Sequence, residues 1–392
     1  MLRSLPADFW RLWSVGLIVT TVRWMETVVM GVVVYKQTGS ALAVASITML
    51  RLLPMALFGA FLGAFAERFD RRLTLAGVIG VLAITSIALA IAARLGELEV
   101  WQLALASLVN GFGWVTDNPV RRVLMGESVG RERMASAVAF DVGGLNASRM
   151  VGPTVGGLLL VGVGIDGTFV MNAAMYLAAI ALALAVRTRM PATPGAGAVL
   201  ARTLEGFAIV FADRRLAATM VVTVIYNVLG WPFISMIPVI GRDQHGLGPE
   251  GIGILTSVDG VGAFFGALAL AFWLTQRWHA PVYVGSVAAY QVGVIAFALA
   301  PEPTTAGLAL LLTGLAGAGF ATLQATIVYL AAPTEMRSRV LGVLSVCIGT
   351  GPIGFVWLGW LADQIGAPTA TAVTGLIGLA ALAATRPMWR TI

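Results

Sequence analysis

The stretch TTVRWMETVVMGVVV, residues 20–34, has the composition of a membrane-spanning helix, yet it carries two charged residues, Arg23 and Glu26. A charge at the centre of a bilayer costs about 2.5–3.5 kcal/mol on insertion scales, so such residues almost always face protein or a water-filled cavity. Residues three positions apart lie on the same face of a helix. The stretch therefore predicts an integral membrane protein in which this face of the helix turns inward.

The composition of the whole chain agrees with a membrane protein. Of its 392 residues, 58% are hydrophobic and 11% are charged, whereas a soluble protein carries about 25% charged residues. The net charge of +6 comes from arginines that are spread through short gaps between apolar runs, which argues against a nucleic-acid partner. The single cysteine, Cys347, excludes an intrachain disulfide, and two distant histidines offer few metal ligands. We expect no metal and no cofactor.

Apolar runs long enough to cross the bilayer occur twelve times. They lie near residues 10–36, 41–66, 73–94, 100–122, 136–163, 166–187, 216–240, 249–275, 280–300, 305–331, 338–362 and 367–388. The first run is expected to stay as a span, because it is too long for a signal peptide and lacks a small-residue cleavage site. The fold expected is all-α, with an N-terminal six-helix bundle (1–188), a cytoplasmic linker (189–215) and a C-terminal six-helix bundle (216–392). Residues 200–211 of the linker are amphipathic, which favours a helix on the membrane surface over an extension of the seventh span.

The distribution of arginine predicts the orientation in the membrane. If the N-terminus is cytoplasmic, nineteen arginines lie in inner segments, and only Lys36, Arg94 and Arg242 lie in outer ones. Cytoplasmic loops carry an excess of Lys and Arg, so this bias predicts that both termini are cytoplasmic.

The two halves of the chain share a weak internal repeat. The first half reads ESVGRERMASAVAF (127–140) and then SRMVGPTVGG (148–157); the second reads PTEMRSRVLGVLSV (333–346) and then GTGPIGFVWLG (349–359). In each half a charged, arginine-bearing loop precedes a helix with Gly-Pro and spaced glycines. Two parallel six-helix repeats that enclose a site between them are a known plan of secondary transporters.

The segment GAFAERFDRRL, residues 63–73, is similar to the loop signature between the second and third helices of the major facilitator superfamily. Within this superfamily, the whole chain resembles bacterial exporters related to enterobactin and multidrug efflux proteins. The residues that match the signature are Gly63, Glu67, Arg68, Arg71 and Arg72. The superfamily commonly has Asp at position 67 and Gly at position 70, where this chain has Asp70. The resemblance implies two six-helix bundles related by a pseudo-twofold axis, and a cytoplasmic charge network that gates them; the alternative is that these charges are solvated anchors.

A second resemblance lies in NASRMVGPTVGG, residues 146–157, which is similar to the Gly-Pro motif in the fifth helix of proton-driven exporters. Gly152 and Gly156 form a smooth stripe on which another helix can pack closely, and Pro153 favours a bend. The motif favours export over import, although small residues serve ordinary helix packing equally well.

Charged residues inside the expected spans are the candidates for energy coupling. They are Arg23, Glu26, Arg51, Asp117, Asp141, Arg149 and Asp259. None lies deep in spans three, six, nine or twelve, which the superfamily fold places on the lipid-facing outside. Asn110, Trp114, Asp117 and Arg121 recur at helical spacing, so this stripe is expected to line a cavity.

We expect Glu26, with Asp117 next in order, to take up and release a proton while Arg23, Arg51 or Arg149 acts as a movable cation nearby. Two alternatives stay open. Glu26 could form a fixed ion pair with Arg23, and Asp117 could be an anchor at a helix end.

Substrate-binding candidates come from the helices that the superfamily places inside. They are Met30, Asn110 and Trp114 in the first half and Tyr226, Asn227, Trp231, Phe320 and Gln324 in the second. Aromatic and methionine side chains with a few amides suit an amphipathic organic molecule better than an ion or a sugar. Trp231 and Phe320 could instead serve packing alone.

Taken together, these features predict a monomeric secondary transporter in a bacterial inner membrane, with a small molecule, protons and lipid as partners. A proton-coupled antiporter that exports drugs, siderophores or metabolites is the first hypothesis. A proton-coupled importer or a lipid flippase of the same fold is the alternative. An enzyme is the distant alternative, because the chain lacks a clustered His/Asp/Glu or Ser/His arrangement, and no G-x-x-x-x-G-K-[ST] loop points to ATP.

Overall fold

The computed structural model describes residues 5–66, 69–130, 133–188 and 199–390, and within these ranges the chain is helical. The first half contains α1 (Ala7–Thr38), α2 (Ala41–Ala66), α3 (Arg71–Leu95), α4 (Val100–Val129), α5 (Met134–Gly162) and α6 (Gly164–Leu184). A shorter helix, α7 (Val199–Ala212), lies within the expected linker.

The second half contains the same number of long segments, but several of them are interrupted. Its seventh segment is built from α8 (Arg214–Ile225), the π-helix η3 (Tyr226–Gly230), the 3-10 helix η4 (Trp231–Met236) and α9 (Ile237–Asp243). Next come α10 (Pro249–Trp273), η5 (Gln276–Trp278), α11 (His279–Ala298) and α12 (Pro303–Ala331). The chain ends with η6 (Thr334–Met336), α13 (Arg337–Ile348), α14 (Gly351–Ile365), α15 (Ala367–Ala384) and α16 (Arg386–Trp389).

Ten of the helical segments in the described part of the chain are long and apolar enough to cross a membrane. The two long helices outside this set are α4 and α5, with 30 and 29 residues. Both are less apolar because they carry buried polar and charged side chains, among them Asp117 and Asp141. The arrangement is consistent with the twelve expected spans and confirms an all-α membrane protein.

Helix ends show the internal repeat at the level of single residues. Glu99 and Glu302 stand immediately before α4 and α12, the fourth helix of each half, and each forms a capping box with the residue three positions on. Asp70, which replaces the glycine common in the superfamily, caps α3 by accepting a hydrogen bond from the backbone N–H of Leu73. The departure at position 70 therefore supplies a helix cap.

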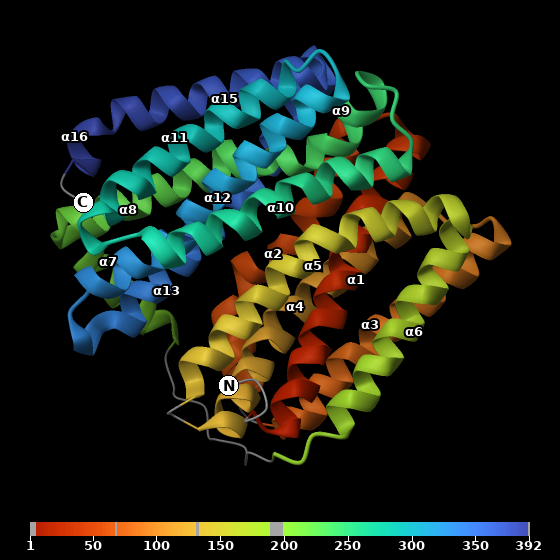
Figure 1. The fold of residues 1–392 in the computed structure, drawn as a ribbon, viewed down its shortest axis with the longest axis horizontal. Helices are drawn as coiled ribbons and strands as arrows, with labels where there is room; N and C mark the ends of the chain where they lie inside the picture. The colour runs from red at the N-terminus through yellow and green to blue at the C-terminus, as the bar shows by residue number, and fades with distance from the viewer. Residues whose placement is uncertain (1–4, 67–68, 131–132, 189–198, 391–392) are drawn as a thin grey trace.

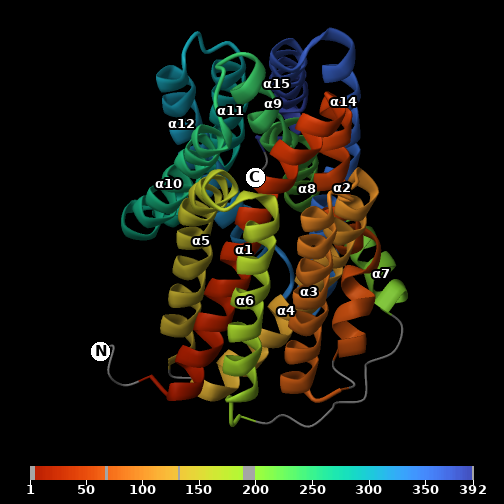
Figure 2. The same cartoon turned by 90° about the vertical axis from the view of Figure 1, so that its right-hand side faces the viewer.

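The helices form two bundles, with α1–α6 in one and α8–α15 in the other (Figure 1). Figure 2 shows α1, α5 and α6 side by side in the first bundle. The bundles meet where α5 packs against α10 and where α2 packs against α14.

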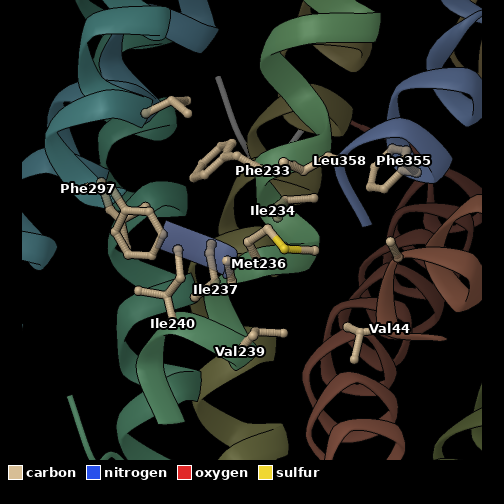
Figure 3. Close-up of a cluster of buried hydrophobic side chains, with 14 of the residues drawn as sticks. Val44, Phe233, Ile234, Met236, Ile237, Val239, Ile240, Phe297, Phe355 and Leu358 are labelled. Atoms are coloured by element: carbon tan, nitrogen blue, oxygen red, sulfur yellow. The ribbon is translucent and has the colours of Figure 1, made fainter. Parts of the chain in front are cut away.

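One hydrophobic core joins the two bundles near the ends of α1 and α9. Val44 of α2 lies in the same core as Phe233, Ile237, Phe355 and Leu358 of the second half (Figure 3). At the opposite end the described residues form two separate cores. One is made by the first half around Phe9 and Leu12, and the other by the second half around Leu216 and Val340. The bundles are therefore held together at one end, which we call the closed end.

The amphipathic stretch at 200–211 lies in the helix α7, which ends before Asp213, the N-cap of α8. It packs against α13, where Glu205 forms an ion pair with Arg339 at 2.7 Å. Gly206 allows this close approach, because a side chain there would meet the backbone carbonyl of Arg339 at 2.5 Å.

Candidate functional site

A buried polar chain runs from α4 through α1. Arg23 donates to both carboxylate oxygens of Asp117, at 2.6 and 3.5 Å, and its Nε donates to the amide oxygen of Asn110 at 3.2 Å. The amide nitrogen of Asn110 in turn donates to Glu26 at 2.6 Å. Arg23, Asn110, Asp117 and Glu26 are each at most 7% exposed. The ion pair of Arg23 is thus with Asp117, while Asn110 connects Arg23 to Glu26.

Glu26 is held by neutral groups. Besides Asn110, it accepts weaker hydrogen bonds from Ser86 of α3 at 3.5 Å and from Asn172 of α6 at 3.4 Å. No ion pair involves Glu26 within the described residues. The amide oxygen of Asn172 is buried and has no hydrogen-bond partner. A buried carboxylate without a cation in contact is costly when charged, and a proton on it would provide a donor for such an acceptor.

A cavity of about 210 Å³ lies against this network, between the two bundles. Its described lining includes the cations Arg23, Arg51 and Arg149 and the aromatic side chains Trp24, Trp114 and Trp231. The remaining lining residues are Thr20, Thr27, Thr48, Leu52, Asn118, Leu145, Asn146 and Ile234. No carboxylate belongs to this lining, and Glu26 and Asp117 lie behind the arginines. The cavity therefore presents positive charge and flat apolar surface together.

One inter-bundle ion pair stands at the edge of the cavity. Arg149 of α5 donates to Asp259 of α10, which is 1% exposed, and the Arg149 guanidinium lies 5.5 Å from the ring centre of Trp24. Glycines bring the two helices together around this pair. A Cβ atom on Gly260 would lie 2.6 Å from the carbonyl oxygen of Arg149. Small residues allow such close helix crossings in membranes.

Polar contacts also join the bundles at the closed end. The hydroxyl of Tyr35 donates to Asp243, and the side chain of Asp363 on α14 accepts hydrogen bonds from Ser40 Oγ and from the backbone N–H of Ala41, both at 2.7 Å. Asp363 therefore caps the N-terminus of α2 although it belongs to the other half of the chain.

The eight predicted substrate residues separate into three groups. Trp114 and Trp231 line the cavity, while Asn110 belongs to the polar chain described above. Tyr226 and Phe320 stack on each other with ring centres 3.6 Å apart, and both are buried. Met30 and Asn227 are also buried, and Gln324 is half-buried; none of these five is part of the described cavity lining. In this conformation the aromatic pair serves packing.

The gating residues are only partly described. Glu67 and Arg68 lie outside the described residues, and Gly63 lies within α2. Arg71 is buried at the start of α3, and Arg72 donates to the carbonyl of Leu184 at the end of α6. The second motif is fully described: Gly152 and Gly156 pack against α1, where a Cβ atom would lie 2.6 Å from Trp24 Cβ and 2.8 Å from Met25 Cα. Pro153 lies inside α5, and its carbonyl faces α10.

Two polar contacts near this network are not predicted from the sequence. Asn172 lies on α6, one of the helices expected to face lipid, yet it donates to Glu26; a polar amide in mid-span is the sequence signal for such a contact. Asp141, one of the charged candidates, pairs with two cations, Arg121 at 2.5 Å and Arg122 at 3.0 Å, which residue spacing alone does not predict. The described residues include no group of His, Cys, Asp and Glu that could hold a metal ion.

Comparison with known proteins agrees with this architecture. A family model described as "Transmembrane secretion effector" matches residues 5–389. Macrolide efflux protein A of Streptococcus pyogenes is 21% identical over 346 residues, covering 84% of this chain and 83% of that protein. The multidrug efflux pump Tap of Mycolicibacterium fortuitum is 24% identical, covering 85% and 84%. The staphyloferrin A transporter of Staphylococcus aureus is 20% identical, covering 83% and 82%.

Solved structures show the same fold. The nucleoside transporter NupG superposes with a TM-score of 0.81 at 14% identity, covering 97% of this chain and 99% of that one. A bacterial homologue of the lysosomal transporter Spinster, in an inward-facing conformation, gives a TM-score of 0.76 at 17% identity, covering 99% and 98%. With the family match spanning nearly all of its length, the chain belongs to the transmembrane secretion effector family of the major facilitator superfamily, and it is a multi-pass membrane transporter rather than an enzyme.

Proposed function

We propose that this protein is a proton-coupled antiporter that exports small amphipathic organic compounds by alternating access. The relatives named for macrolide efflux, multidrug efflux and staphyloferrin A transport support export of organic molecules. The proposal places a single chain in the bacterial inner membrane with both termini in the cytoplasm, as the excess of arginine in the inner segments favours.

The observation that carries the proposal is the cavity between two bundles that share a core at one end only. Alternating access requires a central site whose two ends open in turn, through motion of one bundle against the other. At the other end the described residues of each bundle form a separate core, around Phe9 in the first half and Leu216 in the second, so separation there disrupts neither core. With the N-terminus cytoplasmic, this conformation is inward-facing, and the closed end is the outer one.

Glu26 is the proposed proton carrier, and Asp117 is the second acid in order. The protonated form of Glu26 suits a site in which three neutral side chains, and no cation, contact the carboxylate. Arg23 lies between the two acids, bonded to Asp117 directly and to Glu26 through Asn110. Loss of the Glu26 proton would favour movement of Arg23 away from Asp117 and toward Glu26. Because Arg23 lines the cavity, this change of partner would alter the cavity wall when the proton is released.

The test is transport into inverted membrane vesicles with an acidic interior. An exporter driven by protons accumulates its substrate inside these vesicles, an importer requires the opposite gradient, and an enzyme shows no dependence on it. In Glu26→Gln the accumulation should disappear while downhill substrate movement remains. Glu97→Gln, at an exposed position before α4, is the control and should behave as the parent. Full proton-driven accumulation by Glu26→Gln would remove Glu26 from this role.

A further inference from the structure

The charge of the cavity is not balanced by acids in its wall. Each of its three arginines has a different set of partners. Arg23 is paired with Asp117 at 2.6 Å, and Arg149 is paired with Asp259. Arg51 donates to two neutral oxygens, the carbonyl of Arg23 and the hydroxyl of Thr27, and forms no ion pair with a described carboxylate. The pairs of Arg23 and Arg149 are close to neutral, so the charge of Arg51 remains on the wall.

Two of these guanidinium groups also have unused donors. The Nε atoms of Arg51 and Arg149 are buried and have no hydrogen-bond partner. A buried N–H without an acceptor costs free energy, and arginine is the side chain best shaped to bind a carboxylate or another oxyanion with two parallel bonds. Glu26 acts on Arg51 electrostatically, but it lies outside the lining, where its contacts are Asn110, Ser86 and Asn172.

The same wall offers flat apolar surface. Trp24, Trp114 and Trp231 line the cavity from α1, α4 and η4, so aromatic surface comes from both halves. Rings of this size offer large apolar faces against which planar apolar groups can stack.

We propose that the cavity binds organic anions in which a carboxylate or sulfonate is attached to a planar apolar body. The oxyanion binds at Arg51, with Arg149 beside it, and the apolar body packs on the tryptophans. A cation of the same shape is disfavoured, because the described lining provides positive charge and no carboxylate to compensate it. This inference names the substrate class of the proposed exporter and therefore rests on that function.

The test compares two dyes that share a xanthene ring system, anionic fluorescein and cationic rhodamine 6G, by fluorescence polarisation with purified protein. Fluorescein should bind more tightly than rhodamine 6G. Arg51→Gln should weaken fluorescein binding by about 10- to 100-fold, the range for loss of a charged hydrogen bond. Arg51→Lys keeps the positive charge but loses the planar guanidinium that can donate two parallel hydrogen bonds. Its affinity for fluorescein should lie between those of the parent and Arg51→Gln.

A second variant keeps the test valid if Arg51→Gln does not fold. Asn118→Asp changes one cavity-lining amide to a carboxylate of nearly the same size. It should weaken fluorescein binding by about 10-fold and strengthen rhodamine 6G binding, since it adds a negative charge near the arginines. Rhodamine 6G binding as tight as that of fluorescein in the parent, binding of neither dye, or no response to either substitution would overturn the anion site.

Dye transport into proteoliposomes separates this inference from the proposed function. If only rhodamine 6G is transported, and if its transport depends on the proton gradient as predicted, the anion site is refuted and the proposed exporter function stands. Selective fluorescein binding without any gradient-dependent movement would support the anion site and refute proton-driven export.

Discussion

The contact between α5 and α10 provides a direct test of how the closed end is held. Gly253 of α10 faces the backbone of Pro153 on α5, in the other half of the chain. The substitution Gly253→Ala should favour the conformation in which this end is open, because the added methyl group has no space while the two helices are in contact.

The size of the effect follows from the geometry. A Cβ atom on Gly253 would lie 2.5 Å from the carbonyl oxygen and 3.2 Å from the carbonyl carbon of Pro153. An ordinary contact between such atoms needs about 3.4 Å or more, so the helices must separate by roughly 1 Å. Overpacking of this kind costs about 1–3 kcal/mol, which corresponds to a shift of about 5- to 150-fold in the equilibrium. The gain in helix propensity, about 1 kcal/mol, is present in both conformations and cancels.

Distances between spin labels on the two halves measure this equilibrium. Suitable label sites are Glu97→Cys, before α4, and Pro301→Cys, before α12, because both positions are exposed in loops at the closed end. The buried Cys347 is replaced by serine in all samples. Pulsed electron–electron double resonance should show a larger population of long distances between the two labels in Gly253→Ala than in the parent protein.

Two further glycines serve as controls. In Gly262→Ala the new methyl group would meet the carbonyl of Leu311, within the second half, and in Gly285→Ala it would meet nothing within 4 Å. Gly262→Ala should lower the melting temperature without a change in the ratio of the two distance populations, and Gly285→Ala should change neither. An unaltered distance distribution in a folded Gly253→Ala protein would show that this crossing does not hold the end closed.

Three further outcomes are expected. Asp363→Asn weakens the cap that crosses from α14 to α2 and costs about 1 kcal/mol, so the open population at the same label sites should rise about fivefold, and no change would rule out a gating role for Asp363. Asp141→Asn leaves the buried Arg121 without its acid, which should destabilise the protein by about 3–5 kcal/mol and show as early inactivation in a thermal assay in detergent. Phe320→Ala removes the ring stacked on Tyr226 and should destabilise the protein by a similar amount, about 3–5 kcal/mol; a normal melting temperature with altered dye binding would instead place this pair in the binding site.

The sequence contains enough information to predict the fold and the helices that carry the polar network. The helical spacing of Asn110, Trp114 and Asp117 predicts one polar face on the fourth span, and the structure brings all three to Arg23. A charge in mid-membrane must have a partner, so its presence in the sequence already predicts a buried interaction. The partner itself depends on helix rotation, which residue spacing does not determine. The pairing of Arg23 with Asp117, rather than with Glu26, is therefore visible only in the structure.

The binding surface was harder to predict than the charges. Tyr226 and Phe320 have the residue types of a substrate site, but the same types fill the interior of a helix bundle, and here they pack on each other. The seventh span, expected near residues 216–240, changes from an α-helix to a π-helix and then to a 3-10 helix that contains Pro232. Pro232 is a sequence signal for such a break. Trp231, which follows the π-helix, lies in the cavity wall, whereas Tyr226 is buried outside the described lining.

The position of the charges constrains how proton binding can move the protein. Arg23, Glu26 and Asp117 all belong to the first bundle, so a change in their pairing alters one bundle and does not by itself separate it from the other. A contact that crosses between the bundles must transmit the change. Among the described ion pairs, only that of Arg149 with Asp259 crosses, and Arg149 shares the cavity wall with Arg23. If the proposed proton coupling holds, a ligand in the cavity would contact Arg23 of the first-bundle network and the crossing Arg149–Asp259 pair at once. The occupied cavity, rather than either acid alone, would then couple proton transfer to motion.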